Sequence, residues 1–144
     1  MIEVINNRLK NSEQIDKSYA NIELILGRNG QKFNQIAEKI REGENVLYYG
    51  YDIIMHLCSG DIAHILNLVK NIFELAGGPD KFNSDSKFVL PINKDIQNKA
   101  IKDMGGEFLN KIENIPNNGK QLRAIAEAFG ELSHWYLILS LIHI

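Results

Sequence analysis

Apolar residues recur at the three- and four-residue spacing of an amphipathic helix along most of this 144-residue chain. The spacing predicts a short helix over 33–40, a more apolar segment over 46–58, and a helix over 62–76. Longer helices are predicted over 93–112 and from residue 118 onward. Because no segment alternates between apolar and polar residues as a half-buried strand does, the pattern predicts an all-α protein.

Two clusters of turn-forming residues divide the chain. Residues 77–80 read Gly-Gly-Pro-Asp and precede a polar run, and residues 114–119 form the second cluster. We expect a helical domain at residues 1–78, followed by a linker at 79–92. A second helical region at 93–139 and a short tail at 140–144 would follow. The pair Gly105-Gly106 interrupts the second region, and each glycine costs about 1 kcal/mol relative to alanine. The pair suggests a kink or a close helix crossing.

Both ends of the sequence depart from the pattern of a complete domain. Residues 1–5 begin inside an amphipathic helix and have no capping residue before them. Residues 137–144 form an uncharged apolar run that would promote aggregation if it were exposed on the surface of a folded protein. We therefore expect truncation at both ends, with residues 140–144 not native to the protein. The alternative is a native C-terminus that is buried against a partner.

Composition excludes several classes of protein. Hydrophobic residues make up 44% of the chain and charged residues 24%, as in a folded globular domain. The net charge of -2 argues against nucleic-acid binding through an overall positive surface charge. It is compatible with a local basic patch. The single cysteine, Cys58, excludes an internal disulfide. We see neither a signal-peptide core nor a membrane-spanning run, so we expect a cytoplasmic protein without a membrane partner.

The two glycine-lysine strings of the chain do not match a phosphate-binding loop. A Walker A motif needs its first glycine five residues before the second, and a Ser or Thr after the lysine. Neither Gly27 to Lys32 nor Asn117 to Gln121 meets these conditions. Both strings are therefore interpreted as ordinary turns. We expect no catalytic residue, no cofactor and no enzymatic activity in this chain by itself.

Side chains that could bind a metal are poorly spaced. His56, Cys58 and His64 lie close in sequence, but they form neither an HExxH motif nor paired CxxC motifs. We therefore expect no metal site, and we interpret Cys58 as a small core residue. Carboxylates and lysines of the predicted helix over 93–112 alternate at i,i+4 spacing, as in Asp95/Lys99, which is typical of a solvated face.

The segment Ser59-Gly60-Asp61 has the residue types of a helix start. Ser59 can cap the helix, Gly60 allows close backbone approach, and Asp61 complements the positive end of the helix dipole. By these arguments alone, the segment is a well-capped helix start. The helix that follows carries an apolar stripe that we expect to be buried, formed by Ile62, Ile65, Leu66, Val69, Ile72, Phe73 and Ala76.

This segment also resembles a known motif. Ser-Gly-Asp followed by a helix with Leu66 five residues after Asp61 resembles the sensor-2 helix in the lid of AAA+ ATPases, in particular the origin-recognition (ORC-type) replication initiators. Other segments are similar to the helix leading to the lid, the stretch after the lid and the start of the next helical region. They are residues 2–9, then 90–92, 96–101 and 108–109, then 115–119 and 128–130.

The resemblance implies an AAA+ lid-like helical bundle followed by a further helical segment, for which a winged-helix-like fold is one option. It implies a lid that moves with the nucleotide state and passes this motion to a C-terminal region that binds DNA or a partner protein. An N-terminal ATPase core would precede the lid and would supply the Walker motifs, ATP and Mg²⁺. The chain would then be a fragment of an ATPase.

The resemblance also implies which residues lie near the nucleotide. They are Ser59, Gly60, Asp61, Ala63, His64 and, as a weaker candidate, Arg8. In the family's motif an arginine two residues after the Asp reaches the γ-phosphate, and here that position is Ala63. His64 is the next residue, but it would project about 100° round the helix. The chain therefore lacks the cation that the family uses at this position.

A second hypothesis needs no missing core. The chain could be a stand-alone helical interaction module, or a helix-turn-helix regulator without enzymatic activity. A phosphate-binding loop encoded upstream would favour the first hypothesis, and a stop codon just before Met1 would favour the second.

Overall fold

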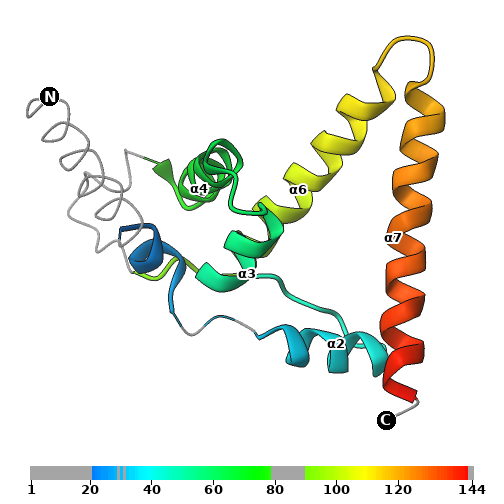
Figure 1. The fold of residues 1–144 in the computed structure, drawn as a ribbon. Coiled ribbons are helices and arrows are strands. Elements are labelled where there is room, and N and C mark those ends of the chain that lie inside the picture. The colour runs from blue at the N-terminus through cyan, green and yellow to red at the C-terminus, as the bar shows by residue number, and fades with distance from the viewer. Residues whose placement is uncertain (1–20, 29, 31, 79–89, 143–144) are drawn as a thin grey trace, which may run out of the picture.

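The computed structural model describes residues 21–28, 30, 32–78 and 90–142 (Figure 1). Residues 21–26 are helical. The elements that follow are α2 (Phe33–Arg41), α3 (Tyr51–Leu57), α4 (Ile62–Leu75), α6 (Lys94–Glu113) and α7 (Gly119–Ile142). No strand occurs among these described residues, so the predicted all-α fold is confirmed. None of the described helices combines the length and apolarity that crossing a bilayer requires.

The apolar segment over 46–58 contains a helix that is shorter than the segment. Residues 46–50 are not helical, and α3 starts at Tyr51. Gly50 has a φ of 95°, a region that favours glycine, and a Cβ at this position would overlap the Cα of Gly30. The close approach of these two backbone segments, together with the positive φ, therefore requires glycine at residue 50, directly before α3.

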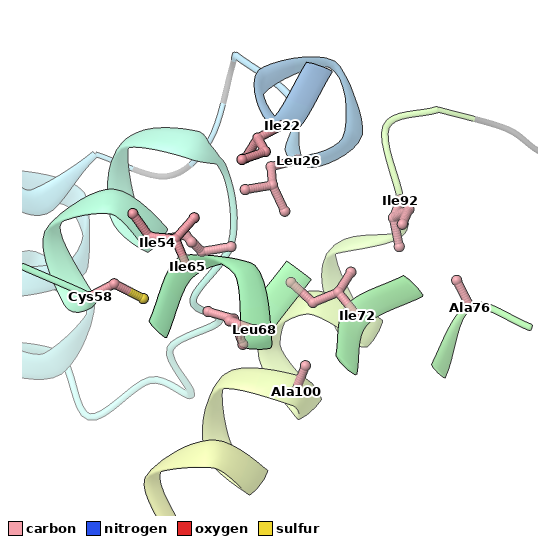
Figure 2. Close-up of a cluster of buried hydrophobic side chains, with 10 residues drawn as sticks. All are labelled: Ile22, Leu26, Ile54, Cys58, Ile65, Leu68, Ile72, Ala76, Ile92 and Ala100. Carbon is pink, nitrogen blue, oxygen red and sulfur yellow. The ribbon is translucent and has the colours of Figure 1, made fainter. Parts of the chain in front are cut away.

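A single apolar cluster fills the centre of the molecule (Figure 2). Its buried members are Ile22, Leu26, Ile54, Cys58, Ile65, Leu68, Ile72, Ala76, Ile92 and Ala100. α4 supplies the middle of this cluster, where Leu68 and Ile72 are both 0% exposed. Ile92 and Ala100 follow the undescribed residues 79–89, so side chains from both sides of that gap share one core. The division into domains stays a prediction.

The buried stripe of α4 is rotated from the one that the sequence predicts. Ile65 and Ile72 are buried as expected, but Ile62 is 52% exposed and Leu66 is 53% exposed. Leu68, which the expected stripe does not include, lies at the centre of the buried face. α4 has apolar residues on too many sides for one packing surface to cover, and the core takes only the face around Leu68.

Gln97, near the start of α6, is a buried polar residue that joins three backbone segments. Its Nε2 donates to the carbonyl oxygens of Leu26 at 3.0 Å and Ile92 at 2.8 Å. Its Oε1 accepts from the Gly50 N–H at 2.9 Å. The next residue, Asn98, accepts from the Tyr48 N–H at 3.0 Å through its Oδ1. Gln97 satisfies backbone groups that would otherwise be buried without partners, and Asn98 binds the N–H of the half-buried Tyr48.

α6 and α7 form an antiparallel helical hairpin, and α2 lies against the C-terminal part of α7 (Figure 1). Arg123 of α7 donates to the Asn110 side chain of α6 at 3.1 Å and pairs with the Glu113 carboxylate. Asn93 caps α6, since its Oδ1 accepts from the Asp95 N–H at 2.7 Å. α4 also contacts α6.

The expected close helix crossing at Gly105-Gly106 is wrong. α6 runs through both glycines, and a Cβ at either position would meet nothing within 4 Å. The glycines therefore lie on an exposed face of α6, where no neighbouring helix requires their small size.

Replacing Gly105 with alanine should stabilise the protein by about 1 kcal/mol, because alanine loses less backbone entropy in a helix and open space surrounds its methyl group. Gly106→Ala should give the same result, and urea denaturation followed by circular dichroism measures both changes. A loss of stability in either variant would mean that these positions pack against another part of the protein.

Replacing Gln97 with alanine should destabilise the protein by about 3 kcal/mol, because it leaves a buried N–H and two buried C=O groups without partners. The matched control is Lys99→Ala on the same helix. Lys99 makes an exposed ion pair with Asp103 at 2.7 Å, and its loss should cost less than about 0.5 kcal/mol. Equal effects of the two substitutions on the free energy of unfolding would contradict this role of Gln97.

Candidate functional site

The Ser59-Gly60-Asp61 turn ends α3 before it starts α4. Ser59 has a φ of 52°, and its N–H donates to the His56 carbonyl at 3.0 Å. The Gly60 N–H donates to the Met55 carbonyl at 3.1 Å. This pair of hydrogen bonds is the Schellman motif, which closes a helix by a residue in the left-handed region. Ser59 is that residue, so its backbone reverses the chain.

The cap of α4 is Asp61, and the expectation that Ser59 caps this helix is wrong. The Asp61 Oδ1 accepts from the Ala63 N–H at 2.9 Å and from the His64 N–H at 3.3 Å. Gly60 has a φ of 70°, and a Cβ there would meet nothing within 4 Å. Gly60 therefore serves the backbone conformation, not a close approach of another segment.

Ala63 and His64 occupy the first turn of α4. Ala63 is exposed, whereas His64 is half-buried. The His64 Nδ1 lies 3.5 Å from Asp61 Oδ2, and its ring meets the Phe108 ring of α6 edge to face, with the centroids 5.0 Å apart. Lys111 places its Nζ 5.6 Å from the centroid of the same Phe108 ring. The first turn of α4 is therefore in direct contact with the second half of α6.

A polar groove of about 300 Å³ opens between α4 and α6 beside this contact. His64, Lys70 and Glu107 are among the residues that line it. A larger hollow, about 510 Å³, lies elsewhere, between residues 23–28 and the start of α6, and its lining is mostly apolar. The buried Gln97 forms part of the wall of that hollow.

Three other sequence predictions concern the reactivity of Cys58, a metal site and the position of Arg8. Cys58 is buried; burial raises the pKa of its thiol, and the Asp61 carboxylate raises this pKa further. The thiol is therefore kept protonated and is a poor nucleophile. Within the described part of the chain, no group of three His, Cys, Asp or Glu side chains could hold a metal ion. Arg8 lies outside the described residues.

The Gly119-Lys120 turn is structural. Gly119 is buried, its N–H donates to the Ile115 carbonyl at 3.1 Å, and a Cβ there would overlap the Glu113 carbonyl. The turn is packed against the end of α6, which agrees with its interpretation as a helix start.

Sequence reasoning missed the contact between His64 and Phe108. Phe108 follows the helical apolar spacing of α6, so the pattern marks it only as a core candidate. No signal within the sequence indicates that its ring meets His64, which lies 44 residues earlier in the chain.

Comparison with known proteins identifies the family. The model of the ORC-CDC6-like family matches residues 3–142, which is nearly the whole chain. The chain belongs to the ORC-CDC6-like family. No curated protein and no solved structure matches it significantly. The match places this ORC-CDC6-like chain among relatives of the origin-recognition type of AAA+ protein, the family that the sequence resembles.

Two substitutions in the turn of this ORC-CDC6-like protein should have opposite effects on stability. Asp61→Ala removes the side chain that caps α4 and should cost about 1 kcal/mol. Ser59→Gly relieves a positive φ and should stabilise the protein by about 0.5 kcal/mol. Thermal denaturation measures both. A destabilised Ser59→Gly variant would mean that the serine side chain makes an important contact.

Proposed function

We propose that this chain is the lid, with the first part of the following region, of an ORC-CDC6-like AAA+ ATPase. The lid couples the nucleotide state of an N-terminal ATPase core to the α6–α7 hairpin, which forms part of a region that binds DNA or a partner protein. The observation that carries this proposal is the family match over residues 3–142. It is supported by the contact of the first turn of α4 with α6.

The exposed face of α4 supports contact with another protein surface. Ile62 and Leu66 are one helical turn apart on α4 and about half exposed. Exposed apolar side chains that gather on one side of a protein are typical of a protein interface. We infer that an ATPase core covers this face and thereby brings Ala63 close to the nucleotide.

A chain of contacts connects the first turn of α4 to the hairpin. His64 contacts Phe108 in the second half of α6, and Arg123 connects the end of α6 to α7 through Asn110 and Glu113. Helices are stiff, so a displacement of the first turn of α4 would be passed along α6. In this proposal, packing transmits the nucleotide state, because the position of the family's arginine holds Ala63.

The helix-turn-helix alternative is supported by one observation. Four residues connect α3 to α4, and a glycine lies among them, as in helix-turn-helix motifs. The exposed face of α4 argues against it, since this face carries Ile62 and Leu66 beside Lys70, and Lys70 lies 3.8 Å from Glu74. A helix that enters a DNA groove needs cations for the phosphates and polar side chains for the bases.

The proposal is tested by restoring the missing cation. In the ATPase that carries this lid, Ala63→Arg should tighten ATP binding about tenfold, because a charged hydrogen bond to the γ-phosphate contributes about 1.5–3 kcal/mol. Isothermal titration calorimetry with ATP and with ADP measures this change. The tightening should be larger for ATP, since only ATP has the γ-phosphate.

The matched control is Ala124→Arg, which adds the same charge at an exposed alanine of α7. It should leave both affinities unchanged. Unchanged ATP affinity in Ala63→Arg would contradict the correspondence with sensor 2. The 144-residue chain by itself should show no saturable ATP binding; binding that Lys120→Ala abolishes would instead assign phosphate binding to the Gly119-Lys120 turn.

A further inference from the structure

α7 carries large apolar side chains at alternating intervals of three and four residues. We call this set the α7 stripe; it consists of Leu122, Ile125, Phe129, Leu132, Tyr136 and Leu139. This spacing gives the a and d positions of a heptad repeat over nearly three heptads. Over these residues a period of 3.5 drifts by only about 50° from the helical period of 3.6, so the spacing fits a coiled-coil seam as well as a helix that covers a core, and the exposure of the stripe distinguishes the two.

The α7 stripe is exposed along its whole length. The exposed fractions run from 41% at Leu122 to 73% at Tyr136, and Phe129 and Leu132 are 65% and 64% exposed. α6 contacts a different side of α7, where Arg123 is half-buried. α2 lies against the C-terminal part of α7, where Tyr136 and Leu139 are still 73% and 51% exposed. The described neighbouring helices therefore leave about two fifths or more of each stripe residue exposed.

The polar residues of α7 follow the same heptad. The charged residues and the histidine all fall at b, c or f, the positions farthest from the seam of a coiled coil; they are Lys120, Arg123, Glu127, Glu131 and His134. The e and g positions that flank the seam are uncharged, and most of them are small: Gln121, Ala126, Ala128, Ser133 and Trp135. Two such stripes can therefore meet without placing like charges against each other.

The exposed area is sufficient for a stable dimer. The stripe together with Trp135, which is 60% exposed, presents roughly 800 Å² of surface if each free side chain has about 200 Å². A specific protein interface of standard size buries about 800 Å² on each partner. Contiguous apolar patches on monomers seldom exceed about 600 Å².

We propose that the α7 stripe is a dimer interface, on which α7 of a second copy of this chain packs as a coiled coil. A second copy is the occupant because a heptad seam requires a partner helix with the same period, and α7 itself supplies that helix. The interface is separate from the exposed face of α4. The dimer therefore does not depend on the proposed coupling to a nucleotide.

Sedimentation velocity of the 144-residue chain, from low to high micromolar concentration, tests this proposal. The expected result is a reversible shift from the monomer of 16.4 kDa to a species of twice this mass. Phe129→Glu places a charge in the seam and should raise the dimer dissociation constant about tenfold or more. The matched control, Ala124→Glu, adds the same charge at a c position and should leave the dissociation constant unchanged.

Trp135 gives an independent measurement, because the chain has one tryptophan. Its emission should shift to shorter wavelength as the dimer forms, in the unchanged chain and in Ala124→Glu but not in Phe129→Glu. Circular dichroism should show the same helix content in both variants, because Phe129 and Ala124 are exposed.

Three outcomes would overturn the proposal. One is a chain that stays monomeric at every concentration. A second is equal weakening of the dimer by Phe129→Glu and Ala124→Glu, which would place the interface elsewhere. The third is a monomer in which acrylamide cannot quench Trp135, which would mean that another segment of the same chain covers the stripe.

Discussion

The side-chain amide of Gln97 holds the fold together at one point. Its two ends bind Leu26, Gly50 and Ile92, which belong to three stretches of chain that are distant in sequence. A primary amide can do this because it donates two hydrogen bonds and accepts others in fixed directions. The start of α6 is thereby fixed against the helical residues 21–26 and the start of α3, and α4 packs against the same core. The contact of α4 with α6, on which the proposed function depends, follows from this arrangement.

The helices were predictable from the sequence because apolar periodicity depends only on which residue types recur. Gln97 was not predictable, since a polar residue within a helical pattern normally faces water. The same limit applies to α4, where periodicity allows Ile62 or Leu68 on the buried face, and only the neighbouring helices decide between them. Apolar periodicity therefore predicts well where the helices occur. It predicts poorly which face of a helix is buried when the helix is apolar on several sides.

The candidate site was partly predictable for a different reason. The turn at Ser59-Gly60-Asp61 was found because its residue types are those of a helix start and because the order resembles a family motif. Which residue of the turn ends α3 and which caps α4 was not predicted, because serine, glycine and aspartate all suit several positions of a turn. Only the hydrogen bonds of the structure assign Ser59 to the end of α3 and Asp61 to the start of α4. The contact of His64 with Phe108 joins residues distant in sequence, which local patterns do not detect.

The two exposed glycines of α6 have a mechanical consequence. They divide the helix into a half that Gln97 and Ala100 anchor in the core and a half that carries Phe108 and Glu113. Backbone hydrogen bonds break most readily where the residues have the most freedom in the open state, and glycine has the most. Bending of α6 should therefore cost least at its middle, where it would move the half that contacts His64 and α7 relative to the half that is anchored in the core.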